Sequence, residues 1–209
     1  MAQPVDRRDP GPSDEALLVR ARSGDERAFA AIVTRHEPRV AATAIGMLGP
    51  GNEAEDVGQE TFIRLYRSLD RFRGDASLGT YLTRIAMNLS LTALRRRKSW
   101  YARFVPAGAG PEGREADGRT AAGPRIEAIA AEGTRDALAS LETEERAARV
   151  RRALDELKPE HRAVVVLRWM EGLSTRDTAK ALGVPEGTVM SRLYRAMDRL
   201  GTALEGDDA

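Results

Sequence analysis

The feature that most constrains the fold is a run of apolar residues between Phe29 and Met47, which recur at steps of three and four. This spacing places their side chains on one face of a single long helix. Aromatic residues make up only 5% of the 209-residue chain. Because β-sandwiches and barrels are rich in aromatic and β-branched residues, this composition favours an all-α fold.

The first half of the chain predicts four helices with short connections, which together form a compact bundle. A short helix from Asp14 to Arg22 precedes the long one, and a turn from Arg73 to Ser77 precedes the fourth. Between them, Asn52 is the expected N-cap of the third helix. Glu55, three residues later, would complete a pattern close to a capping box.

A change of composition divides the chain into parts. The segment Pro106 to Pro124 contains five alanines, five glycines and three prolines, and it has no large apolar side chain. Such a composition is typical of a flexible linker. We therefore predict a disordered tail (1–12), a helical domain (13–101), a linker (102–141) and a second helical domain (142–205).

The second domain contains the pattern of a helix-turn-helix. A short helix with Ala179 and Leu182 on its apolar side is followed by the tight turn Gly183-Val184-Pro185, and then by a final helix from Glu186 to Leu204. Pro159 opens the helix before this motif. That helix carries a run predicted to be buried: Val164 to Leu167, Trp169 and Met170.

The second helix of this motif presents polar residues away from its apolar positions, Val189 and Leu193. These polar residues are Thr188, Ser191, Arg192 and Arg195. Hydroxyl and guanidinium groups can contact base edges and phosphates in a major groove. On spacing alone, an ordinary helical hairpin with a solvated face remains an equal alternative.

The charge pattern indicates two kinds of partner surface. The net charge is only +1, but Glu53 to Glu60 holds four carboxylates and no base, whereas Arg95 to Lys98 is entirely basic. One surface therefore suits a basic partner and the other an anionic one. Of the two histidines, His36 is predicted on a helix face or in the core and His161 at the surface.

Several function classes are excluded or disfavoured. The absence of cysteine excludes disulfides, thiolate metal sites and cysteine nucleophiles. We find no phosphate-binding loop and no nucleophile with a base, so we expect no enzyme activity, no cofactor and no metal. No segment approaches 18 apolar residues, and the first 13 residues lack the apolar core of a signal peptide. We therefore expect no membrane insertion and a cytoplasmic protein.

Two separate stretches resemble the bacterial RNA polymerase sigma factors of the extracytoplasmic-function (ECF) class. The run LGVPEGTVMSRLYRA from Leu182 to Ala196 is similar to their helix-turn-helix domain. Ala54-Glu55-Asp56-Val57, Gln59 to Phe62 and the segment from Tyr81 to Asn88 are similar to their other domain. The matches occur in the order that the family has and lie on either side of the linker.

The resemblance implies a non-enzymatic factor that binds core RNA polymerase, directs it to promoter DNA and assists DNA opening. The alternative is a stand-alone helix-turn-helix transcriptional regulator, and an enzyme with an appended helix-turn-helix is disfavoured. In the family, one acidic helix binds the clamp helices of the largest polymerase subunit. The matching residues are Asp56, Gln59, Glu60 and Phe62. From the residues alone, the acids of this helix also suit its first turns, where they complement the dipole, and both roles can hold together.

The resemblance also implies two DNA contacts. The helix-turn-helix residues Thr188, Ser191, Arg192 and Arg195 would read the minus 35 element. The minus 10 element would meet Phe72, Tyr81, Arg84, Asn88 and Arg95, with a flipped base held in the loop from Phe72 to Leu78. Many relatives have Trp where this chain has Tyr81, which can still pack or stack. Many relatives are also held inactive by an anti-sigma protein.

Overall fold

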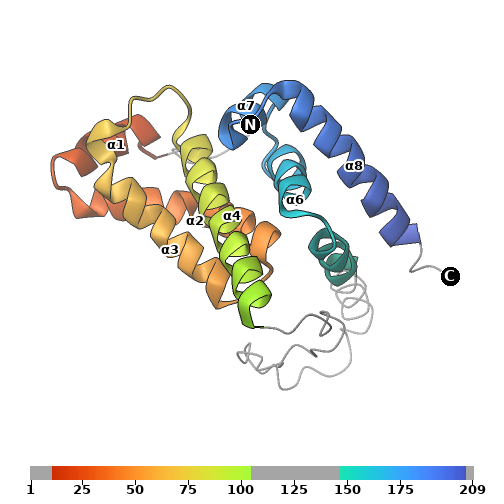
Figure 1. Ribbon diagram of the computed structural model, residues 1–209. Helices are drawn as coiled ribbons and strands as arrows, with labels where there is room; N and C mark the ends of the chain where they lie inside the picture. The colour runs from red at the N-terminus through yellow and green to blue at the C-terminus, as the bar shows by residue number, and fades with distance from the viewer. Residues whose placement is uncertain (1–10, 105–145, 206–209) are drawn as a thin grey trace, which may run out of the picture.

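The computed structural model describes residues 11–104 and 146–205 (Figure 1). All the regular elements in these two ranges are helical, which confirms the predicted fold class. Residues 1–10 of the predicted tail (1–12) and residues 105–141 of the predicted linker (102–141) lie outside the described residues. Residues 102–104 are helical, so the first helical domain extends three residues beyond its predicted end. Two helical regions remain, one on each side of residues 105–145.

The N-terminal region is the predicted four-helix bundle. Its elements are α1 (Asp14–Arg22), α2 (Glu26–Leu48), α3 (Asn52–Arg67), a short 3₁₀ turn η1 (Leu69–Arg71) and α4 (Leu78–Phe104). Each α-helix contributes to one apolar core, in which Leu17, Ile32, Leu65 and Leu82 are at most 1% exposed. The apolar stripes at helical spacing therefore explain the bundle.

The helix starts follow local capping chemistry, with one correction. The Asp25 carboxylate accepts hydrogen bonds from the backbone N–H groups of Arg27 and Ala28 and so caps α2. The predicted cap of α3 is wrong by one residue. Gly51 is the N-cap and makes no side-chain cap bond, and Asn52 is already helical. Gly51 has φ +136°, a conformation that favours glycine and leaves asparagine inside the first turn.

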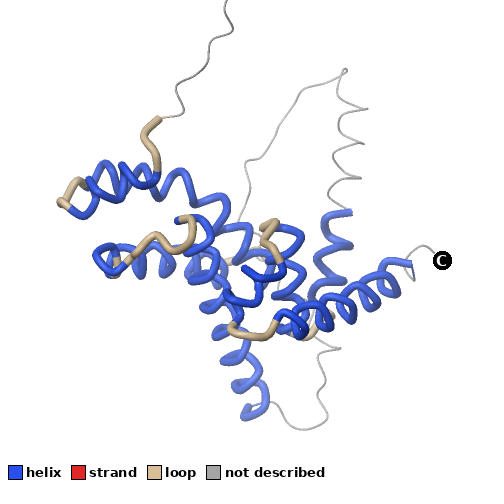
Figure 2. The backbone as a smooth tube through the Cα atoms, turned by 90° about the horizontal axis from the view of Figure 1, so that it is seen from above, coloured by secondary structure: helices blue, strands red, loops and turns tan. Residues whose placement is uncertain are grey.

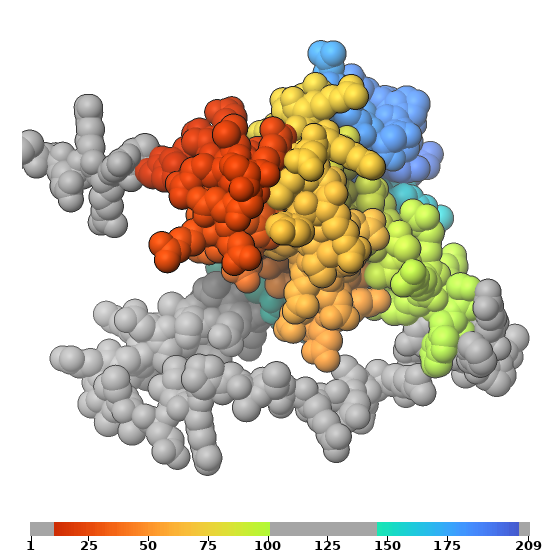
Figure 3. Space-filling view, turned by 90° about the vertical axis from the view of Figure 1, so that its left-hand side faces the viewer, coloured from red at the N-terminus to blue at the C-terminus, as the bar shows by residue number. Residues whose placement is uncertain are grey.

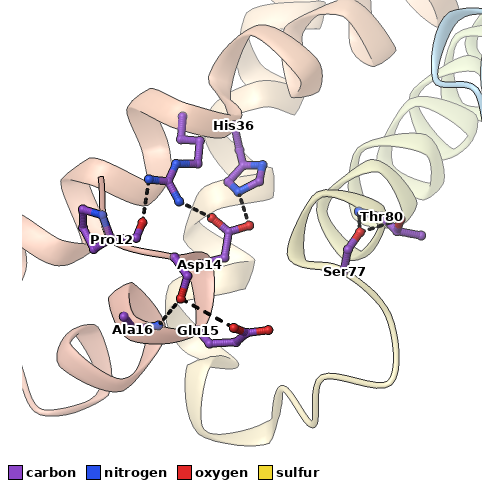
Figure 4. Close-up of polar contacts among 9 residues, drawn as sticks. Pro12, Asp14, Glu15, Ala16, His36, Ser77 and Thr80 are labelled. Atoms are coloured by element: carbon purple, nitrogen blue, oxygen red, sulfur yellow. Dashed lines mark hydrogen bonds and ion pairs between the residues drawn. The ribbon is translucent and has the colours of Figure 1, made fainter. Parts of the chain in front are cut away.

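A polar cluster joins the first two helices (Figure 4). The Asp14 carboxylate accepts a hydrogen bond from Nη1 of Arg35 at 2.7 Å, and its other oxygen lies 3.0 Å from Nε2 of His36. The Pro12 carbonyl accepts a further bond from Arg35. The partly buried His36 therefore lies on a helix face, as its spacing predicts. Figure 4 also shows Ser77 and Thr80 at the start of α4.

The C-terminal region contains the predicted helix-turn-helix. A helix over residues 146–155 is followed by α6 (Pro159–Val165), which continues as a π-helical turn η3 (Val166–Met170), and by α7 (Thr175–Leu182) and α8 (Glu186–Glu205) (Figures 1 and 2). Gly183, with φ +65°, ends α7. Val189 is fully buried beneath the motif, so the predicted packing of the two helices is confirmed.

The predicted buried run is wrong at its end. Val164 to Leu167 are buried, but Trp169 is 62% exposed and Met170 is 50% exposed. The π-helical turn is the physical reason, because an extra residue per turn rotates the following side chains out of the buried stripe. Gly172 then ends the segment with φ +65°.

The two regions pack against each other. In Figure 1 the C-terminal helices lie beside α4, and α2 also contacts η3 and α6. A shared apolar cluster contains Met47 and Met87 from the N-terminal region and Val166 and Leu167 from the C-terminal region. The sequence pattern does not predict this contact.

Candidate nucleic-acid and polymerase interfaces

The recognition helix α8 displays the four predicted residues on its accessible side. Ser191 and Arg195 are exposed, whereas Thr188 and Arg192 are half-buried. The Ser191 hydroxyl donates a hydrogen bond to the Thr188 carbonyl at 3.1 Å. Because Val189 is buried on the opposite side, the hydroxyls and guanidiniums lie on the side of α8 that faces away from the core.

These four residues line one shallow cavity between α8 and the start of α6. Lys158, His161 and Arg199 line it as well, and so do two acids, Glu160 and Asp198. We call the hydroxyl-bearing and basic residues of this lining the basic surface. Arg199 lies four and seven residues after Arg195 and Arg192, so helical spacing could have identified it. Lys158 comes from a distant segment, and only the fold brings it here.

His161 is buried, so its predicted surface position is wrong. Burial lowers the pKa of His161. Glu160 opposes this shift, whereas the positive charges of Lys158, Arg195 and Arg192 add to it. The imidazole is therefore neutral at pH 7, and the charge of the basic surface comes from lysine and arginine.

The loop between η1 and α4 forms a second cavity. Phe72, Tyr81 and Arg84 line it together with the loop residues Arg73 to Ala76. The rings of Phe72 and Tyr81 lie 5.0 Å apart, and the Arg84 guanidinium lies 5.3 Å from the centre of the Tyr81 ring. The structure therefore brings three of the five minus 10 candidates together. Partly buried aromatic rings that line a cavity beside a guanidinium suit a nucleobase.

Two residues that the sequence analysis missed hold this loop. Arg22 donates to the Leu69 carbonyl at 2.9 Å and to the Phe72 carbonyl at 2.6 Å. The Tyr81 hydroxyl lies 3.1 Å from the Ser68 hydroxyl. The Tyr81 hydroxyl is thus anchored, its ring contacts Phe72 and Arg84, and the side chain packs against the N-terminal core. No sequence signal points to Arg22, whose partners are backbone carbonyls.

The remaining minus 10 candidates extend this surface along α4. Arg84, Asn88 and Arg95 are all exposed. Their spacing of four and seven residues places them on one face of the helix. That face begins at the loop and continues toward the basic run.

The polymerase candidates on α3 divide into two groups. Asp56 and Gln59 are exposed. Glu60 forms an ion pair with Arg64 at 2.8 Å, and Phe62 packs against the N-terminal core. Of these four side chains, Asp56 and Gln59 are therefore the most accessible to a partner.

Two further searches cover the described residues only. Within residues 11–104 and 146–205, no group of three acidic or histidine side chains could hold a metal ion. In the same ranges no helix is both long enough and apolar enough to cross a membrane.

Comparison with known families matches both regions. Residues 32–99 match the family model Sigma-70 region 2, and residues 147–200 match Sigma-70, region 4. The RNA polymerase sigma-H factor of Pseudomonas aeruginosa is 33% identical over 199 residues, which is 92% of this chain and 94% of that protein. The chain belongs to the sigma-70 family, in its ECF class. The ECF RNA polymerase sigma-E factor of Escherichia coli K12 is 32% identical, covering 92% of this sigma factor and 95% of its own length.

Solved structures give the same fold. CnrH, solved in complex with the cytosolic domain of CnrY, matches with a TM-score of 0.61 and 28% identity. The alignment covers 94% of this sigma factor and 99% of CnrH. The sigma factor RpoE of Bartonella quintana, solved with the anti-sigma factor NepR, matches in fold with a TM-score of 0.58 and 23% identity, over 85% of this chain and 96% of that one.

Membership of this family decides between the interpretations of the sequence. The protein is a sigma factor that binds core RNA polymerase and promoter DNA for transcription initiation, and the stand-alone regulator is not supported. Sigma factors are in general non-enzymatic DNA-binding initiation factors. Each of the candidate surfaces falls within one of the matched segments: α3, the loop and α4 in the first, and the recognition helix in the second.

Proposed function

We propose that this sigma factor reads a two-part promoter with its two regions while α3 holds core polymerase. The basic surface on α8 reads the minus 35 element as duplex DNA. The loop after η1 and the exposed face of α4 read the minus 10 element as the strands separate. The observation that carries this proposal is that each region presents one exposed polar surface suited to nucleic acid.

The minus 35 assignment rests on the basic surface. Thr188, Ser191, Arg192 and Arg195 line a single cavity with two further cations, Lys158 and Arg199. A guanidinium can bind guanine through two hydrogen bonds, and hydroxyls can bond to bases or phosphates. The cations beside them neutralise phosphate charge and fix the register of the helix on the duplex.

The minus 10 assignment rests on the loop cavity. The tilted pair of Phe72 and Tyr81, with Arg84 above the Tyr81 ring, provides aromatic and cationic faces for an unstacked base. Asn88 can bond to a base edge, and Arg84 and Arg95 can hold phosphates of the same strand. Because the cavity would bind a base that has left the stack, it would favour promoter sequences whose bases unstack easily.

The polymerase assignment rests on the exposed acids of α3. A basic partner helix would be steered by the charge of Asp56, and Gln59 would supply a directed hydrogen bond. Glu60, already paired with Arg64, and the partly buried Phe62 support the helix from beside this contact. The proposed partner is the pair of clamp helices of the largest polymerase subunit.

Three further properties belong to the proposal. The factor performs no chemistry itself and acts in the cytoplasm, where transcription takes place. An anti-sigma protein holds it inactive until a signal arrives. The support for this partner is the family resemblance together with CnrH, a 28% identical sigma factor that was solved in complex with the cytosolic domain of CnrY.

The test is a double substitution on α3, Asp56→Arg with Gln59→Ala. A reversed charge in a desolvated contact costs about 3–5 kcal/mol, which removes binding at micromolar concentrations. Because both side chains are exposed, the helical content should not change. Circular dichroism checks the fold, and a pull-down with purified core polymerase measures binding.

Glu37→Arg is the matched control, since Glu37 is also an exposed acid of the N-terminal region but lies on α2. The control should bind core polymerase normally. A folded double variant that binds as well as the unsubstituted protein would remove α3 from the interface.

A further inference from the structure

A buried glutamate joins the two regions. The Glu171 side chain, at the end of η3, is only 3% exposed. Its carboxylate accepts hydrogen bonds from Nε of Arg39 at 2.6 Å and from the Thr43 hydroxyl at 2.8 Å, both on α2. The Thr83 hydroxyl of α4 donates to it at 3.3 Å. Every one of these partners belongs to the N-terminal region.

A second polar contact crosses the same boundary. Arg162 of α6 is 4% exposed and donates to the Met47 carbonyl at 2.8 Å, near the end of α2. The last carbonyls of a helix lack partners within the helix, so this bond satisfies one of them. The Asp155 carboxylate, 2.8 Å away, balances the arginine charge. The boundary therefore has two sets of directed bonds in addition to its apolar cluster.

Two side chains of η3 come close to one glycine of α2. A methyl group added at Gly46 of α2 would lie 3.0 Å from Sδ of Met170 and 3.1 Å from Cγ2 of Val166. The three nearest atoms outside the α2 backbone all belong to these two residues of η3. A larger residue at position 46 would thus press first on the C-terminal region.

The contact also affects the proposed minus 10 surface. The loop cavity that Phe72, Tyr81 and Arg84 line is closed on another side by Asp177, Lys180 and Ala181 of α7. Figure 3 shows the loop region, in yellow, directly against the blue C-terminal helices. The first helix of the helix-turn-helix therefore stands beside the site proposed for a flipped base.

This arrangement cannot read both promoter elements together. Minus 10 and minus 35 elements are separated by roughly two turns of DNA, about 70 Å, whereas here the two DNA-reading regions share one apolar cluster. Twenty extended residues also span roughly 70 Å, so the segment between the regions is long enough for them to separate. Promoter reading thus requires the contact to break.

We infer that the described arrangement is a closed, self-inhibited state of the sigma factor. The bonds of Glu171 and Arg162 and the close approach at Gly46 hold α7 against the loop cavity until core polymerase or DNA separates the regions. This inference rests on the proposed function, because it concerns access to the proposed minus 10 and minus 35 surfaces. A closed population of about nine in ten would weaken apparent promoter affinity about tenfold.

The test opens the contact with Gly46→Leu and measures both distance and activity. Gly201→Leu is the control, since Gly201 is also helical and has no atom within 4 Å of an added methyl group. The chain has no cysteine, so Val19→Cys and Thr202→Cys, which are exposed positions in the two regions, accept spin labels without interference. Pulsed electron resonance reports the distance between the labels. Promoter-dependent transcription at limiting sigma factor reports activity.

The closed state predicts a short, narrow distance distribution for the parent protein and the Gly201→Leu control, and a long, broad one for Gly46→Leu. Transcription should rise about tenfold in Gly46→Leu and should stay unchanged in Gly201→Leu. Glu171→Gln, which removes the ion pair without adding bulk, should shift both readouts in the same direction.

Identical broad distributions for the parent and Gly46→Leu would overturn the closed state. Opening without any gain in promoter-dependent transcription would overturn inhibition, while leaving the proposed function intact. If neither the parent protein nor Gly46→Leu supports promoter-dependent transcription with core polymerase, the proposed function fails, and self-inhibition fails with it. The distances between the labels still decide whether the two regions are in contact.

Discussion

The two helical regions differ in how they bury their apolar side chains. The N-terminal region has one continuous core to which all four helices contribute, from Leu17 in α1 to Leu82 in α4. The C-terminal region divides its interior into small clusters around Leu154 and around Val189, and it completes a third only by packing against α2 and α4. A small region buries a smaller share of its surface, so it gains more from a neighbour.

This difference shows which part of the molecule is expected to move. The region with its own core carries the proposed polymerase contact and the proposed minus 10 surface. The region with a shared core carries the recognition helix. Separation therefore exposes Val166 and Leu167 of the C-terminal region, which makes that region the less stable partner when the two are apart.

The largest expected effect is on core stability. Leu82→Ala should lower the free energy of unfolding of the N-terminal region by about 2–5 kcal/mol, because it leaves a cavity in a continuous core. Leu167→Ala should cost the C-terminal region a similar amount and should also loosen α2 near Met47. Amide hydrogen exchange, measured peptide by peptide, separates the two regions.

An even loss of amide-exchange protection from α1 to α4 in Leu167→Ala would contradict this difference between the two regions. That result would mean that the regions unfold as a single cooperative unit.

The next effect separates the two DNA surfaces. Arg195→Ala should weaken binding of minus 35 duplex DNA by about 1–3 kcal/mol, the value of a bidentate arginine–base contact. Arg151→Ala, which removes an exposed arginine that does not line the basic surface, should change affinity much less. Fluorescence anisotropy with labelled duplexes measures both. Equal losses for the two variants would show that only total charge matters.

A smaller effect tests the role of Tyr81. Tyr81→Phe removes the hydrogen bond to Ser68 and keeps the stacked ring, so it should lower stability by about 0.5–1.5 kcal/mol. Urea denaturation measures this loss, and binding of single-stranded minus 10 DNA should stay within a few-fold of the parent. A selective loss of DNA binding at unchanged stability would instead make the hydroxyl a DNA contact.

The smallest effect is a pH dependence confined to the C-terminal region. The pKa of His161 is lowered in the folded protein, mainly by burial, so below about pH 6.5 the unfolded chain takes up the proton first. Stability should therefore fall as the pH drops through that value toward the folded pKa. His161→Gln should flatten this dependence, and urea midpoints at pH 7.5 and pH 5.5 measure it. An unchanged pH dependence in the variant would exclude His161 as its source.

The helices could be predicted from the sequence because local patterns determine them. The bounds of α1 agree with the predicted Asp14 to Arg22, and Asp25 caps α2 through its own side chain. The errors occurred where the backbone departs from regular geometry. Gly51 took the cap position from Asn52 through a positive φ, and a π-helical turn turned Trp169 toward solvent.

The candidate site was only partly predictable, for a different reason. Spacing along one helix is enough to align Arg84, Asn88 and Arg95, and the structure exposes all three. Contacts between segments that are distant in the sequence produce no comparable pattern of residues. An apolar stripe does not specify which helix covers it, so the pattern could not reveal that Met87 packs against the C-terminal region, nor that Glu171 would be buried there.

The measurement that tests the central claim most directly is transcription with purified core polymerase on a library of genomic fragments, with mapping of transcript starts. The account predicts new starts that share two separated sequence elements. Arg195→Ala should relax the upstream element, and Asn88→Ala should relax the downstream one. Starts no different from those of core polymerase alone, or one element that both variants alter equally, would contradict the account.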